Sequence, residues 1–126
     1  MSATNFLEEK MIGHAFAGES FSPGTTFYAA LFTVAPGEAG GGTECSGGGY
    51  ARVSCTFSRS SSTVDNDAVI EFPVSTADRD PVVATGLFDA ASGGNLLFYY
   101  VFGTPKDYDT GQRPRFPAGD FDITLN

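Results

Sequence analysis

Near the start of the chain, hydrophobic residues recur at the spacing of an amphipathic helix. They are Leu7, Met11 and Ala15 at intervals of four, with Ile12 and Phe16 beside them on the same side. Asn5 can cap the first turn, and Glu8, three residues later, can complete a capping box. Gly18 follows the last periodic residue and is a suitable stop. The pattern predicts an α-helix over about residues 5–17, which needs a surface to pack on because three turns do not persist alone.

From about residue 26 onward the pattern changes to short extended segments rich in β-branched and aromatic residues, separated by Gly, Pro and Ser. The clearest alternation places Val53 and Cys55 on one face, with Tyr50 and Arg52 on the other. We expect strands over 26–33, 50–57, 69–72, 82–88, 96–102 and 121–125, brief edge strands at 106–109 and 115–116, and a loop at 58–62. The most apolar segment, 96–102, is predicted to be the central strand. The sequence therefore predicts a mainly β fold, an antiparallel β-sandwich or barrel-like domain with one N-terminal α-helix.

Seven glycines are concentrated in residues 37–49, and we expect this segment to be a loop without regular structure. It lacks the Lys-Ser/Thr of a phosphate cradle and precedes a strand rather than a helix, which excludes a mononucleotide site of that type. We interpret residues 40–49 as a flexible arm that becomes ordered against a neighbouring subunit. Gly40, Gly41 and Gly42 are therefore candidate partner contacts.

The length of 126 residues indicates one domain, residues 1–126. Fifteen acidic residues against seven basic ones give a net charge of −8, too little positive charge for a nucleic-acid partner and unfavourable for anionic membranes. The longest apolar run, Leu96–Phe102, is far too short for membrane insertion. The first ten residues lack a basic start followed by an apolar core, so we expect a chain made in a cytoplasm without a signal peptide.

Candidate catalytic groups are few. His14 is the only histidine, and no serine lies in a G-x-S-x-G turn, which favours an exposed or interface histidine over a catalytic triad. Cys45 and Cys55 are interpreted as free thiols, with a disulfide possible if the glycine-rich loop folds back on the strand. The sequence predicts no enzyme and no catalytic residue.

Acidic residues occur in pairs two positions apart, at 65/67, 78/80, 107/109 and 120/122. The stretch from Asp107 to Gly111 begins like a calcium-binding loop but lacks the third acidic position and the distal glutamate. A solvated sheet face produces the same spacing. We therefore expect no cofactor, and calcium remains the alternative.

Tyrosines offer rigid contact area with a polar tip, which suits both protein interfaces and sugar stacking. Tyr99 and Tyr100 are consecutive, so one of them should point away from the core of a strand. The predicted partner-interface residues, on the helix, the glycine-rich loop and the tyrosines, are Leu7, Met11, Phe16, Gly40, Gly41, Gly42, Tyr50, Tyr99 and Tyr100.

An ordered series of short motifs spans nearly the whole chain. It includes Ala30-Leu31-Phe32-Thr33, Ser46-Gly47-Gly48-Gly49-Tyr50-Ala51-Arg52, Phe72-Pro73, Gly86-Leu87-Phe88-Asp89-Ala90, Gly93-Gly94-Asn95-Leu96-Leu97-Phe98 and Thr104-Pro105-Lys106. In their order and spacing these motifs resemble the small tail-fibre-like structural proteins of tailed bacteriophages and prophages. Cys45, Arg79-Asp80, Arg113-Pro114-Arg115 and Asp120 depart from the pattern of that group.

The resemblance implies a non-enzymatic virion protein on the particle exterior, associated with the tail fibre or tail tip and assembled in the bacterial host cytoplasm. Its implied partners are copies of itself, joined in a symmetric oligomer, and other phage structural proteins of the tail or capsid. Two alternatives remain open: a capsid decoration (cement) protein that stabilises the phage head, and a carbohydrate-binding β-sandwich module that contacts a host-surface glycan.

Overall fold

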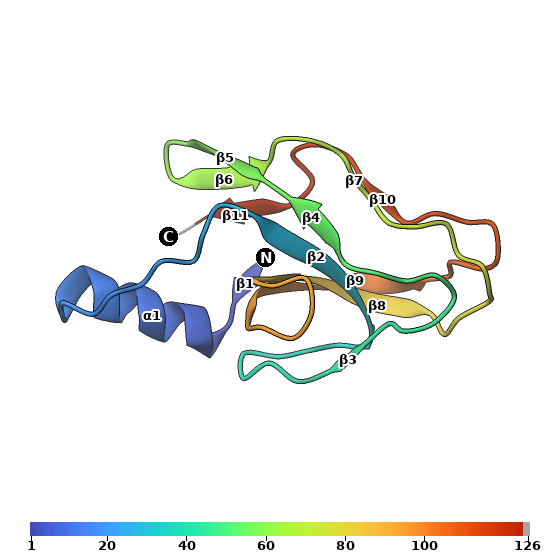
Figure 1. Ribbon diagram of the computed structural model, residues 1–126, viewed down its shortest axis with the longest axis horizontal. Helices are drawn as coiled ribbons and strands as arrows, with labels where there is room; N and C mark the ends of the chain where they lie inside the picture. Colours follow the sequence, from blue (N-terminus) through green and yellow to red (C-terminus); the bar gives the residue numbers. More distant parts are fainter. Residues whose placement is uncertain (125–126) are drawn as a thin grey trace.

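The computed structural model describes residues 1–124, and it is mainly β with antiparallel sheets and one N-terminal helix, as predicted (Figure 1). The elements in chain order are β1 (Ser2–Ala3), α1 (Asn5–Phe16), β2 (Phe27–Val34), β3 (Thr43–Glu44), β4 (Val53–Cys55), β5 (Phe57–Ser60), β6 (Thr63–Asn66), β7 (Ile70–Glu71), β8 (Val82–Phe88), β9 (Leu96–Lys106), β10 (Arg115–Phe116) and β11 (Asp122–Thr124). The sheets of this part of the chain are sandwich-like and form no closed barrel. No helix among these residues is long and apolar enough to cross a membrane.

The main sheet has the strand order β1-β9-β8-β2-β3, and β4 pairs with a further part of β2. Strand β8 lies in the middle of this sheet, between β9 and β2. Its small residues Ala84, Thr85 and Gly86 are all buried, and their size lets the adjacent strands and the side chains on both faces of the sheet pack closely against β8. The prediction that residues 96–102 form the central strand is wrong. On its other side, within residues 1–124, β9 pairs only with the two residues of β1, and its middle is exposed at Tyr100 and Val101.

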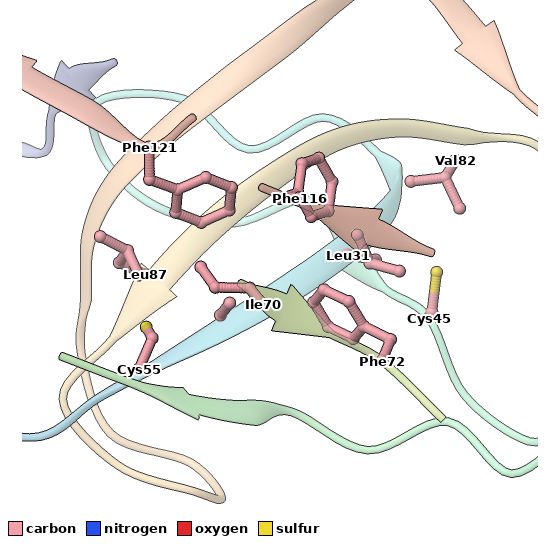
Figure 2. Close-up of a cluster of buried hydrophobic side chains, with 10 residues drawn as sticks. Leu31, Cys45, Cys55, Ile70, Phe72, Val82, Leu87, Phe116 and Phe121 are labelled. Atoms are coloured by element: carbon pink, nitrogen blue, oxygen red, sulfur yellow. The ribbon is translucent and has the colours of Figure 1, made fainter. Parts of the chain in front are cut away.

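Two smaller sheets, β11-β6-β5 and β10-β7, complete the fold. The core lies between them and the main sheet, where Figure 2 shows Ile70, Phe72 and Phe116 directed toward Leu31 and Leu87. Phe116 is the centre of an aromatic cluster, with its ring centroid 5.1 Å from that of Phe121 and 6.1 Å from that of Phe72. The aromatic residues therefore supply much of the buried surface that holds the sheets together.

Strand boundaries differ from the predictions where exposed segments carry no hydrophobic signal. The predicted strand 50–57 is divided into β4 and β5, and the predicted loop 58–62 belongs to the β5–β6 hairpin, in which Ser60 pairs with Thr63. Strand β9 continues to Lys106, whereas the rest of the predicted edge strand 106–109 belongs to no strand. The predicted strand 121–125 is observed at Asp122–Thr124, and its last residue, Leu125, lies outside the described residues.

The N-cap of the helix lies one residue before the predicted cap. Thr4, not Asn5, is the N-cap, and its hydroxyl oxygen lies 3.5 Å from the backbone nitrogen of Leu7, which donates to it. The same hydroxyl donates to the Leu96 carbonyl at 2.6 Å. Because these bonds to β9 set the start of the helix, Glu8 lies one position too late for the predicted capping box.

Candidate functional site

An apolar groove of about 420 Å³ lies between α1 and the β-rich body. Its walls come from elements far apart in the sequence: Leu7 and Met11 from α1, Phe57 from β5, Val64 from β6, Leu87 from β8 and Ile123 from β11. Among the described residues that line it, Arg59 is the sole charged one. Apart from Arg59 and the hydroxyls of Ser61 and Ser62 its wall is apolar, and no carboxylate or histidine among the described residues lines it, so it suits the binding of an apolar partner better than catalysis.

The opposite face of α1 carries two exposed hydrophobic side chains, Ile12 with 63% and Phe16 with 88% of its surface accessible. The prediction that they share the side of Leu7 and Met11 is wrong. At 3.6 residues per turn, Ile12 and Phe16 lie about 140° and about 180° around the axis from Leu7. Of the predicted contacts on the helix, Leu7 and Met11 therefore line the groove, whereas Phe16 points away from it.

The prediction that the glycine-rich segment lacks regular structure is wrong. Gly37 and Gly40 exchange two backbone hydrogen bonds of 3.0 and 2.9 Å, and β3 within the same segment pairs with β2. The backbone N–H of Asn5 donates to the Glu38 carbonyl at 2.8 Å. This contact brings the predicted interface residues Gly40 and Gly41 beside the start of the helix, so two of the three predicted contact regions are neighbours in space.

Gly42 is required where the segment turns back. It has a φ of +75°, and a Cβ there would lie 2.6 Å from the Val34 carbonyl oxygen and 2.8 Å from the Pro36 nitrogen. Gly40 and Gly41 also have positive φ, but a Cβ on either would meet no atom within 4 Å. Glycine at 42 therefore permits a close approach of two backbone segments, whereas at 40 and 41 it only permits the turn.

Tyr50, predicted on the strand face opposite Val53 and Cys55 and as a partner contact, lies before β4 and packs against the core. Its hydroxyl donates to Glu44 Oε2 at 2.6 Å and accepts from the Leu31 N–H at 3.1 Å, and its ring stacks on Phe72. Burial, followed by the hydrogen bond to Glu44, raises the pKa of Tyr50. Burial alone would raise the pKa of Glu44, but hydrogen bonds from Arg52 and Tyr50 hold it below the usual value.

Tyr99 is partly buried, whereas Tyr100 keeps 50% of its surface exposed at the edge of a second groove of about 520 Å³. This groove also contains Phe102, Lys106 and Asp120. Phe102 and Lys106 were not predicted as site residues, because their proximity to Asp120 depends on how β9 lies against the chain near β11. The acidic pair 120/122 was the one feature of the sequence that pointed to this groove.

The acidic pairs and the cysteines show ordinary structural contacts. Asp78 Oδ1 accepts from the backbone N–H and the hydroxyl of Thr110, at 2.9 and 3.0 Å, and both bonds lower the pKa of Asp78. Within residues 1–124 there is no group of three or more His, Cys, Asp or Glu side chains that could hold a metal ion. Cys45 and Cys55 are buried free thiols, as predicted.

A β-rich chain with an apolar groove on one side of its helix and exposed hydrophobic residues on the other has surfaces of the kind that other proteins bind. Comparison with family models places it more closely. The model described as "Podophage GP4 fiber I protein gp80" matches residues 2–124, and the chain belongs to this family. The resemblance to tail-fibre-like structural proteins of phages is thereby confirmed. No curated protein matches the chain.

Proposed function

We propose that this chain is a non-enzymatic structural component on the exterior of a phage particle, associated with the tail fibre or tail tip and assembled in the host cytoplasm. The observation that carries the proposal is the match of a phage fibre family model to residues 2–124. The partners are copies of the chain and other phage structural proteins.

The surface of the protein supports a role in assembly. Ile12 and Phe16 are exposed to solvent on a helix of which only Leu7 and Gly13 are buried. Removing large apolar side chains from water is favourable, by about 1.5–3 kcal/mol for each one fully buried. A neighbouring subunit that covers this face and enters the groove would gain that energy, because residues 1–124 leave both surfaces uncovered.

Particle composition tests the placement. We expect purified virions to contain a handful of copies, located at the tail by antibody labelling of an epitope attached to the chain. Hundreds of copies distributed over the head would overturn the tail placement in favour of capsid decoration. Absence of the chain from particles that are otherwise complete would overturn the proposal as a whole.

The second groove favours a carbohydrate-binding role as a second candidate function. The exposed ring of Tyr100 lies in the same groove as Lys106, Asp120 and Asp122, which can bind sugar hydroxyls. On a glycan array, this function predicts binding by the native chain that is lost in Tyr100→Ala. Tyr28→Ala is a matched control, because Tyr28 lies outside this groove. A blank array, or equal binding by Tyr100→Ala, would contradict the carbohydrate role, and a chelator would show whether calcium takes part.

A further inference from the structure

Helix α1 separates two apolar surfaces that residues 1–124 leave uncovered. Leu7 and Met11 contribute to the groove on the side of the body, and Ile12 and Phe16 stand in water on the opposite side. Because the two surfaces lie about half a turn apart around the helix axis, a chain cannot place its own Ile12 and Phe16 in its own groove. A second copy can do so.

The spacing of the exposed residues suits insertion into a groove. Glu8, Ile12 and Phe16 follow one another at intervals of four and form a stripe along α1, which we call the outer stripe. Helices that bind in apolar grooves present their anchors at this spacing. A volume of about 420 Å³ lies within the range of pockets that enclose several groups, so it has room for both apolar side chains.

The charges of the two surfaces are complementary. The chain has a net charge of −8, yet none of its described carboxylates lines the groove, and Arg59 is the charged residue there. The outer stripe carries the carboxylate of Glu8 at one end. An occupant with two apolar anchors and one acid therefore matches the groove in both hydrophobicity and charge, and α1 itself has that composition.

We infer that the outer stripe of one copy docks in the groove of the next copy, so that the groove is a site for this chain's own helix. The inference deepens the proposed function, since it rests on the self-association proposed there. Because each copy uses its stripe for one neighbour and its groove for another, the contact is head-to-tail. Such contacts close into rings or continue as filaments, rather than forming an isolated two-fold pair.

Mixing two complementary variants of the full chain tests the contact. Phe16→Asp removes the more exposed apolar anchor of the stripe, at its C-terminal end, and leaves the groove intact. Ser62→Trp fills the groove and leaves the stripe intact. Both positions are exposed, so neither change disturbs the core. We expect the native chain to form oligomers by light scattering after gel filtration, each variant alone to have the mass of one chain, and an equimolar mixture to give only 1:1 dimers.

Assembly of the mixture should stop at dimers, because a mixed pair has one intact stripe bound in one intact groove and no second intact contact through which to add another chain. Ile12→Asp should repeat the behaviour of Phe16→Asp, and Val34→Asp, an equally acidic change at an exposed valine on β2, should leave the native oligomers unchanged. Native-like assembly of Phe16→Asp, loss of assembly in Val34→Asp, or a mixture that stays monomeric or grows beyond dimers would overturn the inference.

The two proposals fail in different ways. A native chain that is monomeric in solution would overturn the docking of α1 and would leave the placement on the virion standing. A chain that forms the expected oligomers but is absent from purified particles would overturn the virion role and would leave the contact standing. Incorporation of Phe16→Asp into particles at the native level would separate attachment to the particle from self-association.

Discussion

The guanidinium carbon of Arg52 lies 3.5 Å from the centre of the Phe88 ring. The same guanidinium donates to both carboxylate oxygens of Glu44, at 2.9 and 2.8 Å, and to the carbonyls of Ala90 and Gly93. Only 8% of the Arg52 side chain is exposed. One side chain thus joins β3, the segment before β4 and the connection from β8 to β9.

Replacing Arg52 with lysine should destabilise the fold strongly, because an ammonium cannot reproduce the planar fork that bonds Glu44 and stacks on Phe88. We expect a loss of about 2–3 kcal/mol in the free energy of unfolding, measured with urea. Arg113→Lys is the matched control. Its ion pair with Glu71 is exposed on both sides and 3.4 Å long, so the change should cost less than about 0.5 kcal/mol. Equal losses would contradict the role of Arg52.

The stability contributed by Glu44 should depend on pH. Its pKa is held below the usual value in the folded protein, so its contribution is fully present above the unfolded pKa of about 4.3 and is lost as pH falls through the folded pKa. We expect the difference in unfolding free energy between the native chain and Glu44→Gln to be constant from pH 6 to 8. It should shrink below about pH 4.3. A difference that grows on acidification would contradict the sign of this shift.

Two neighbouring glycines should respond very differently to alanine. Gly41→Ala introduces a side chain at a φ of +78° into open space and should cost about 1 kcal/mol from backbone strain alone. Gly42→Ala adds a close approach to the backbone of Val34 and Pro36 and should cost at least about 2 kcal/mol more. Thermal and urea unfolding of both variants measure this difference. Similar stabilities would show that the close approach at Gly42 is easily relieved.

The cysteines should react slowly in the folded protein. Burial raises the pKa of the Cys55 thiol to about 11 and also raises that of Cys45, although the charge of Arg79 opposes the rise at Cys45. At pH 8 the reactive thiolate of Cys55 is therefore about a hundredfold scarcer than in an exposed cysteine. Iodoacetamide labelling followed by mass spectrometry should modify an added, exposed Ser92→Cys first. Labelling of Cys55 at a similar rate would contradict its burial.

Local patterns predicted much of the fold because they report on one element at a time. The helix and strands such as 82–88 and 115–116 follow from hydrophobic spacing and turn residues, and they are observed at or near the predicted positions. The β5–β6 hairpin was missed because β5 exposes three of its four residues and carries no alternating signal. The family resemblance likewise depended on the order of motifs, which is a property of the chain itself.

Contacts between segments distant in the sequence determined the features of the structure that local patterns did not predict. Thr4 caps the helix because its hydroxyl also bonds Leu96, 92 positions away, and Tyr50 turns inward because Glu44 and Leu31 satisfy its hydroxyl. Among the predicted interface residues, only packing against the sheet determined that Leu7 and Met11 line a groove while Phe16 stands in water. The sequence by itself determined the β-rich class and the supply of apolar side chains. The tertiary structure decided which of them remain without a partner, because burial depends on neighbours that periodicity does not specify.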